Sequence, residues 1–150
     1  MNDATLHRNW RTEGVVVRRA ADTLKERLAN SGRSTLFDFK GLGGAQMTGA
    51  TWIGAVTIPP KLATGLHHHG RHEVALYIIS GKALIRWGER LEFGAELHPG
   101  DCAYFPPYVP HQEENPDPAV PVEAIAIRSD NERIAVKLPN AIADKPEMVA

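Results

Sequence analysis

Four of the seven histidines of this chain lie within six positions, in the segment HHHGRHE that begins at His67. Side chains alternate faces along an extended strand, so His67 and His69 share one side and His68 points to the other. Glu73 returns to the side of His69 if the segment stays extended, although Gly70 can disturb that alternation. Imidazole and carboxylate groups together suit a divalent ion such as Fe(II), Mn(II), Ni(II), Cu(II) or Zn(II). The segment therefore indicates part of a metal site.

A further ligand has to come from another part of the chain, and His111 is the best candidate. It follows a strand and a turn stiffened by Pro106, Pro107 and Pro110. Such a turn would hold an imidazole with little conformational entropy left to lose. Three neutral imidazoles and one carboxylate would leave two positions of an octahedral ion open for water, substrate or dioxygen. Taken alone, the H-x-H pair is a weak signal, and a solvated polar turn is its alternative interpretation.

The remaining histidines and acids are expected to play other parts. His68 and His72 fall in the opposite register, which favours solvated side chains or side chains that orient a ligand by hydrogen bonding. His7 and His98 are expected at the surface. Cys102 is interpreted as a small buried residue of a strand, with a thiol close to the metal as the alternative. The glutamates that lie among turns are expected to form a solvated face and not a catalytic pair: Glu89, Glu92, Glu113 and Glu114.

Composition limits the class of protein. The chain has 150 residues, 43% hydrophobic and 23% charged, which is close to globular averages. A formal charge of −1 without a basic stripe argues against nucleic acid as a partner. No apolar run approaches the roughly 20 residues that span a bilayer, and the N-terminus does not resemble a signal peptide. With one cysteine and no internal disulfide, a cytoplasmic protein without a membrane partner is expected.

The elements that position these residues are predicted to be short strands. A loose arm at 1–12, a strand at 14–20 and one short helix at 22–32 come first, the helix marked by the capping-box spacing of Thr23 and Glu26. Strands separated by Gly, Pro and polar turns follow, which favours an antiparallel sandwich or barrel. No composition break divides the chain, so a single domain over 1–150 is expected. The predicted strands are 34–40, 51–58, 73–80, 82–88, 90–97, 101–106, 122–129 and 133–138.

These residues resemble the two motifs of the cupin superfamily, G-x5-H-x-H-x(3,4)-E-x6-G and G-x5-P-x-G-x2-H-x3-N. His67, His69 and Glu73 match the ligands of the first motif. Its opening glycine is replaced by Lys61, and Gly81 matches its closing glycine one position late. In the second motif a tyrosine, Tyr108, replaces the middle glycine, and the positions that match are Gly100, Pro106, His111 and Asn115.

The resemblance implies an all-β jelly-roll barrel, or double-stranded β-helix, over about 50–130, as in small single-domain bacterial cupins. It implies one divalent metal per subunit (Fe, Mn, Ni or Zn), held by His67, His69, Glu73 and His111. It also implies a homodimer, often built by exchange of N-terminal strands. Aromatic side chains are expected to line the substrate pocket, namely Trp52, Tyr77, Trp87, Tyr104 and Tyr108.

Fold does not fix chemistry, so several functions stay open. The first hypothesis is a metal-dependent enzyme, a dioxygenase-type oxidoreductase or an isomerase, that acts on a small oxygenated organic substrate. Glu73 would then either stay a ligand or detach to act as the catalytic base. The alternatives are a non-catalytic module that binds a sugar or another small molecule with an occupied metal site, and a structural metal site.

Overall fold

The computed structural model describes residues 51–129, 134–139 and 142–150, the backbone of 33–38, and the single positions 9, 11, 19, 21, 28 and 29. The arm predicted at 1–12, the strand at 14–20 and the helix at 22–32 lie almost wholly outside the described residues. In the described part of the chain, no helix is long and apolar enough to cross a membrane.

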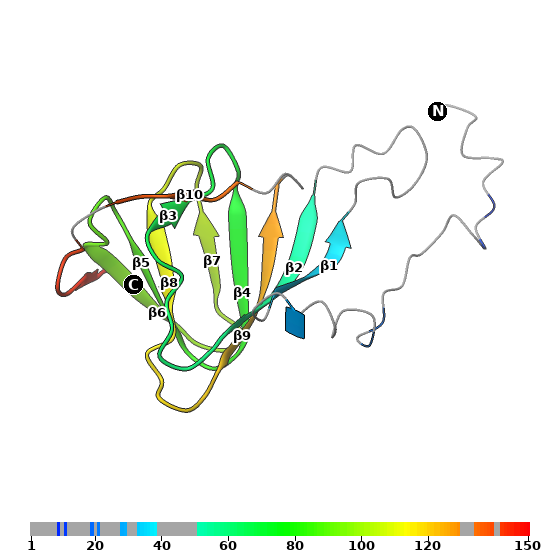
Figure 1. The fold of residues 1–150 in the computed structure, drawn as a ribbon, viewed down its shortest axis with the longest axis horizontal. Coiled ribbons are helices and arrows are strands. Elements are labelled where there is room, and N and C mark those ends of the chain that lie inside the picture. The colour runs from blue at the N-terminus through cyan, green and yellow to red at the C-terminus, as the bar shows by residue number, and fades with distance from the viewer. Residues whose placement is uncertain are drawn as a thin grey trace.

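The described strands form two sheets that face each other (Figure 1). The first sheet is antiparallel, with the order β1-β2-β9-β4-β7. The second has the order β10-β3-β8-β5-β6-β11, antiparallel except for the β11–β6 pair. The first sheet contains β1 (Arg33–Asp38), β2 (Trp52–Ile58), β4 (Val74–Ser80), β7 (Cys102–Phe105) and β9 (Val122–Arg128). The second contains β3 (His67–His68), β5 (Ala83–Trp87), β6 (Phe93–Leu97), β8 (His111–Glu114), β10 (Val136–Lys137) and β11 (Glu147–Met148).

The core lies between the two sheets, and strand alternation decides which residues enter it. In β4, Val74, Leu76 and Ile78 are buried, whereas Tyr77 and Ile79 are exposed. The buried cluster includes residues of both sheets, from Ile58 and Val122 in the first to Ile85 and Leu97 in the second. Burial of this apolar surface is the main force that holds the sheets together. The predicted all-β, mainly antiparallel architecture is confirmed.

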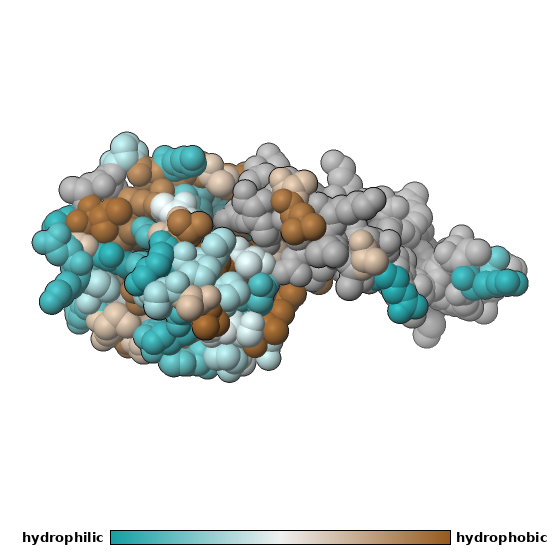
Figure 2. Space-filling model, turned by 60° about the horizontal axis from the view of Figure 1, so that its bottom comes forward, coloured by the Kyte–Doolittle hydropathy of each residue, from teal (hydrophilic) through white to brown (hydrophobic). Residues whose placement is uncertain are grey.

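Hydrophilic and hydrophobic residues are interspersed over the side of the barrel shown in Figure 2. Single exposed apolar side chains are normal for a protein surface. The predicted homodimer stays a prediction, which size-exclusion chromatography with light scattering would check.

The backbone keeps the shape of the two motifs where their glycines are missing. Gly81 and Gly100 have φ angles of 78° and 92°, in the left-handed region that glycine adopts without strain. Lys61 and Tyr108, which replace motif glycines, have φ angles of 62° and 61°. The Tyr108 N–H donates a hydrogen bond of 2.7 Å to the carbonyl of Gly70, which holds this turn against the histidine segment. Both residues are therefore strained by the turn that they complete.

We expect Tyr108→Gly to raise the free energy of unfolding by about 0.5 to 1 kcal/mol. The left-handed conformation costs a residue with a Cβ roughly 1–2 kcal/mol, which exceeds the entropic cost of glycine. Tyr108 is 63% exposed, so little packing is lost. Urea denaturation would measure the change. Tyr108→Ala is the matched control, because it removes the ring but keeps the Cβ. A glycine variant no more stable than the alanine variant would contradict this prediction.

Candidate metal centre

Strands β3 and β8 bring three histidines and one carboxylate together. His67 pairs with His111 across the two antiparallel strands. Glu113 lies two residues beyond His111 in β8 and shares its face. The ring centroids of His67 and His111 are 4.4 Å apart, and that of His69 lies 4.8 and 5.0 Å from them. One ligand atom from each of the four residues lies within 4.8 Å of the others, so the group could hold a metal ion.

Each imidazole of the cluster is oriented by a backbone carbonyl. The Nδ1 atoms of His67, His69 and His111 lie 2.8, 2.9 and 2.9 Å from the carbonyl oxygens of Gly65, Ile134 and Val109. A carbonyl can only accept, so each Nδ1 carries the proton and each neutral ring keeps its Nε2 lone pair. This arrangement is typical of histidines that ligate a metal. The donor set therefore fits a divalent transition metal.

Glu113 is a largely buried carboxylate, with a side chain that is only 14% exposed. Its Oε2 accepts a hydrogen bond of 2.7 Å from the Thr64 hydroxyl, which in turn accepts one from the Glu113 N–H. The His67 and His111 Nε2 atoms lie 3.8 and 3.6 Å from its two oxygens. Burial raises the pKa of Glu113, but His111 and His67 in their protonated form, together with the Thr64 hydroxyl, outweigh it and lower that pKa to about 2. The carboxylate is therefore ionised at neutral pH, as a metal ligand must be.

His69 closes the cluster from the turn after β3. Burial lowers the pKa of His69 to about 4, opposed by the hydrogen bond to Ile134 and aided by the nearby His111 and His67. A lowered pKa keeps this imidazole neutral at neutral pH. Since only a neutral imidazole binds a metal, the environment of His69 favours ligation.

The structure corrects the expectation that Glu73 completes the cluster. Gly70 has a φ angle of 58°, and the His72 N–H donates to the carbonyl of His69 at 3.2 Å, so the chain turns and the strand alternation is interrupted. Glu73 is exposed, and its Oε1 accepts a hydrogen bond of 2.7 Å from the Tyr104 hydroxyl. That bond raises the pKa of Tyr104. Glu73 is therefore on the outer side of the sheet, and neither a ligand nor a base role follows from its position.

The inward position after the turn belongs to Val74, and the fourth ligand comes from β8 instead. Val74 is buried and lines the cavity beside the cluster. Glu113, expected on a solvated face, is the carboxylate of the site, so that expectation is wrong. The signal was present in the sequence: His111-Gln112-Glu113 is an H-x-E pattern that obeys the same alternation as His67-x-His69.

The other candidate residues lie outside the cluster. His68 accepts a hydrogen bond from the Gly70 N–H at 2.9 Å and lies near the Tyr108 ring. His72 is 2% exposed, so it is buried and not solvated. His98 is exposed, as expected, and its Nε2 lies 2.9 Å from a Glu96 oxygen. Cys102 is exposed, which corrects its assignment as a buried residue. Its strand partner is Tyr77, whose side chain faces outward, so the thiol points away from the cavity.

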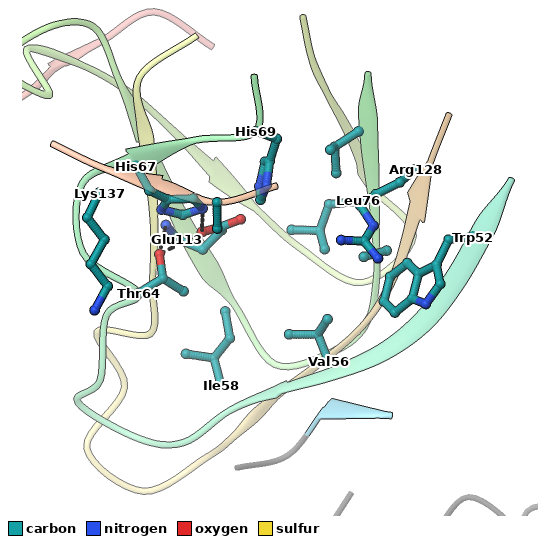
Figure 3. A pocket seen from close by; sticks show the side chains of 13 residues that line it. Trp52, Val56, Ile58, Thr64, His67, His69, Leu76, Glu113, Arg128 and Lys137 are labelled. Atoms are coloured by element: carbon teal, nitrogen blue, oxygen red, sulfur yellow. Dashed lines mark hydrogen bonds and ion pairs between the residues drawn. The ribbon is translucent and has the colours of Figure 1, made fainter. Parts of the chain in front are cut away.

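A cavity of about 220 Å³ lies between the two sheets next to the cluster. His67, His69, Glu113 and Thr64 line one end, as Figure 3 shows. The floor is apolar and comes from the first sheet, with contributions from Val56, Ile58, Leu76 and Ala126. Trp52 and Arg128 line the opposite side (Figure 3). The cluster therefore opens onto a cavity that is smaller than a typical pocket for a drug-sized ligand.

Of the aromatic residues expected in the pocket, only Trp52 lines this cavity. Tyr77, Tyr104 and Tyr108 are 48%, 59% and 63% exposed, and they lie on outward-facing strand positions or in a turn. Trp87 is partly buried against the core, with its ring 6.3 Å from that of Phe93. The pocket predictions for these four residues are therefore corrected. Strand parity explains two of the four, Tyr77 and Tyr104, since residues 75, 77, 102 and 104 face away from the buried Val74 and Phe105.

We expect Thr64→Val to weaken divalent-metal binding by about 10- to 100-fold, the usual effect of losing a hydrogen bond that orients a ligand. Valine keeps the shape of threonine but cannot donate to Glu113 Oε2. Equilibrium dialysis with Zn(II) would measure the dissociation constant. Thr57→Val is the matched control, because the Thr57 hydroxyl donates to Glu123, away from the cluster, in a bond of the same 2.7 Å length. Equal affinity in Thr64→Val and the wild type would contradict the proposed orientation of Glu113.

Two facing β-sheets that enclose a three-histidine, one-carboxylate cluster define a barrel with a candidate metal centre. The family model described as Cupin domain matches residues 54–128. The chain therefore belongs to the cupin domain family, and the resemblance seen in its two motifs is confirmed. No curated protein matches the sequence.

Solved structures with the same fold support this assignment. A cupin 2 domain-containing protein from Halorhodospira halophila is 24% identical, with a TM-score of 0.59 over 73% of this chain and 70% of that one. A conserved protein with a double-stranded β-helix domain from Klebsiella pneumoniae is 18% identical, with a TM-score of 0.58 over 72% and 84%. A deletion mutant of Bacillus subtilis oxalate decarboxylase is 19% identical, with a TM-score of 0.58 over 71% of this chain and 27% of that one. At these identities the likeness concerns the fold.

Proposed function

We propose that this cupin is a metal-dependent enzyme, a dioxygenase-type oxidoreductase or an isomerase, that acts on a small oxygenated organic substrate. The observation that carries the proposal is the set of three Nδ1–carbonyl hydrogen bonds, which leave the Nε2 atoms of His67, His69 and His111 available beside Glu113. A divalent ion bound there would supply a Lewis acid and, if it is iron, a route to dioxygen. One protein of the same fold is an oxalate decarboxylase, which is in keeping with chemistry on a small oxygen-rich molecule.

The residues of this chain contribute an apolar setting in which a substrate would be placed. Val56, Ile58 and Leu76 form an apolar floor, so a substrate in the cavity is held in a low-dielectric space where polar contacts are stronger. Glu113, with its pKa of about 2, stays an anion and acts as a ligand instead of a proton donor. The structure offers no corresponding role to Glu73, whose carboxylate is bound by Tyr104 on the outer face.

The test begins with the metal that copurifies with the protein from its native host, identified by mass spectrometry. The protein is then loaded anaerobically with Fe(II) and exposed to oxygen with a panel of diketones, catechols and hydroxy acids. Oxygen uptake coupled to loss of substrate, or isomer formation without oxygen uptake under Mn(II) or Zn(II), would support the proposal. Tight ligand binding without turnover under every metal would contradict it and favour a non-catalytic binding module.

A further inference from the structure

We propose that Trp52 determines which ligands fit the cavity, because its indole ring forms the wall opposite the metal cluster. The ligand class that this wall admits is a molecule with two oxygen donors at one end and a small apolar body. A longer molecule would meet the indole before its oxygen atoms reached His67 and Glu113. This inference rests on the proposed function for the metal end of the ligand. The assignment of Trp52 itself stands on separate observations.

The first observation is the position of Trp52 in the cavity. It begins β2, where it pairs with Arg128 of β9, which in turn pairs with Val74 of β4. All three residues line the cavity, so this row of the first sheet faces inward. Figure 3 shows the indole on the side of the pocket away from His67 and Glu113. A ligand that extends from the cluster through the cavity would therefore meet the Trp52 ring.

The second observation is that neighbouring residues hold the indole in place. A Cβ atom on Gly54 would overlap the six-membered ring of the indole, so this ring lies directly over the glycine. The Arg128 Cζ lies 4.0 Å from the centroid of the Trp52 ring, a close cation–π contact. Contacts with both residues restrict rotation of the Trp52 side chain. The wall is therefore fixed, and a ligand has to fit the space in front of it.

The third observation is the size of the space between this wall and the cluster. The next inward row of the first sheet holds Gly54, Ala126 and Leu76. Glycine and alanine are small, so they leave room above the floor for the body of a ligand. An apolar cavity of about 150 Å³ holds benzene, and the present cavity measures about 220 Å³. It therefore suits a single ring that carries two oxygen donors, whereas a second ring in line would reach the indole.

The chemistry of the lining residues favours an apolar ligand body. The aliphatic floor offers a ligand no hydrogen-bonding side chain. Outside the cluster, the polar lining residues are Thr64, Arg128 and Lys137. The Thr64 hydroxyl donates to Glu113 at 2.7 Å, and Arg128 lies against the Trp52 ring. Hydroxyl groups along the body of a ligand would face aliphatic side chains and lose their hydrogen bonds to water, which is costly. A sugar is thus a poorer fit than a hydrocarbon body of similar size.

Calorimetric titrations with bidentate probes of increasing length test the proposal. The protein loaded with Zn(II), which is redox-inert, is titrated with acetohydroxamate, benzohydroxamate and 4-phenylbenzohydroxamate. We expect the wild type to bind benzohydroxamate at least about tenfold more tightly than 4-phenylbenzohydroxamate, because the second ring would overlap the indole. Trp52→Ala should abolish this preference, and Trp52→Phe, which keeps a smaller ring, should retain part of it. Acetohydroxamate is too short to reach the wall and should bind all of these proteins equally.

Tyr77→Ala is the matched control, because Tyr77 is an aromatic residue of the same sheet that is 48% exposed on its outer face. It should keep the full preference for the shorter probe. Metal-free protein is tested separately, by saturation-transfer NMR with phenol and 4-phenylphenol. The wild type should bind phenol only, whereas Trp52→Ala should bind both compounds.

Each outcome decides the assignment of Trp52. Equal affinity of the wild type for the one-ring and two-ring hydroxamates would overturn it, even if the Trp52 variants did not fold. A loss of affinity in Trp52→Ala that is the same for all three probes would also overturn it, because the ring would then only support the fold. Failure to bind Zn(II) would contradict the proposed function alone. The metal-free measurements would still judge Trp52, since no difference between the two phenols in the wild type would overturn its assignment.

Discussion

Glu113→Gln is expected to weaken divalent-metal binding by at least about 100-fold, more than the loss of a residue that only orients a ligand. Glutamine has the same shape as glutamate, but it lacks the negative charge that would pair with a divalent metal ion held by His67 and His111. Glu73→Gln is expected to leave the dissociation constant unchanged, because the Glu73 carboxylate lies on the outer face and accepts a hydrogen bond from Tyr104. Equilibrium dialysis with Zn(II) and Mn(II), followed by metal analysis, would measure both values.

The two glutamine variants form a matched pair, since each removes one carboxylate charge and keeps the shape of the side chain. Tyr104→Phe adds a further control: it releases Glu73 from its hydrogen bond and should not change metal affinity. Loss of metal in Glu73→Gln with retention in Glu113→Gln would refute the structure of this site. It would require β4 to shift by one residue, which would also turn the buried Val74, Leu76 and Ile78 toward solvent. The apolar pattern of β4 argues strongly against that shift.

Much of the fold could be predicted from the sequence, because the apolar residues alternate. β4 shows this most clearly, with its run of valine, leucine and isoleucine at every second position. Strands without that pattern were missed: β8 reads HQEE and is held by pairing with β5 and β3, and β3 has only two residues. Their stability comes from neighbours that are distant in sequence, so no alternation of apolar residues marks them as strands.

The candidate site was predictable as far as strand alternation holds. His67, His69 and His111 come together because each lies on, or directly after, a strand whose face is set by its neighbours. Glu73 does not join them, because the turn at Gly70 starts a new strand with a new parity, and the buried Val74 sets that parity. The same parity places Tyr77 outside the pocket. Strand alternation predicts which side chains share a face only within one uninterrupted strand.

His111→Gln is expected to abolish the stabilisation that a divalent metal gives to this protein. His111 is 1% exposed and packs against Phe105 with ring centroids 4.4 Å apart, so its imidazole is held rigidly at the base of the cluster. Glutamine keeps much of the side-chain volume but has no imidazole nitrogen with a lone pair for the metal. In the wild type, Zn(II) at 100 times its dissociation constant should raise the free energy of unfolding by about 2.7 kcal/mol. Thermal unfolding with and without Zn(II) would show that increment in the wild type and not in the variant.

His68→Gln is the matched control for His111→Gln, because His68 adjoins two ligands in sequence but has its Nδ1 bound to the Gly70 N–H. It should keep the full stabilisation by Zn(II). Comparison of the metal-free proteins measures the loss of packing in each variant. The additional stabilisation by Zn(II) measures the loss of a ligand. A variant without His111 that still gains the wild-type increment, or a His68 variant that loses it, would show that the metal is held elsewhere. We expect neither result, because the His111 Nε2 lies 3.6 Å from Glu113 Oε1 and His67 pairs with His111 across the neighbouring strands β3 and β8.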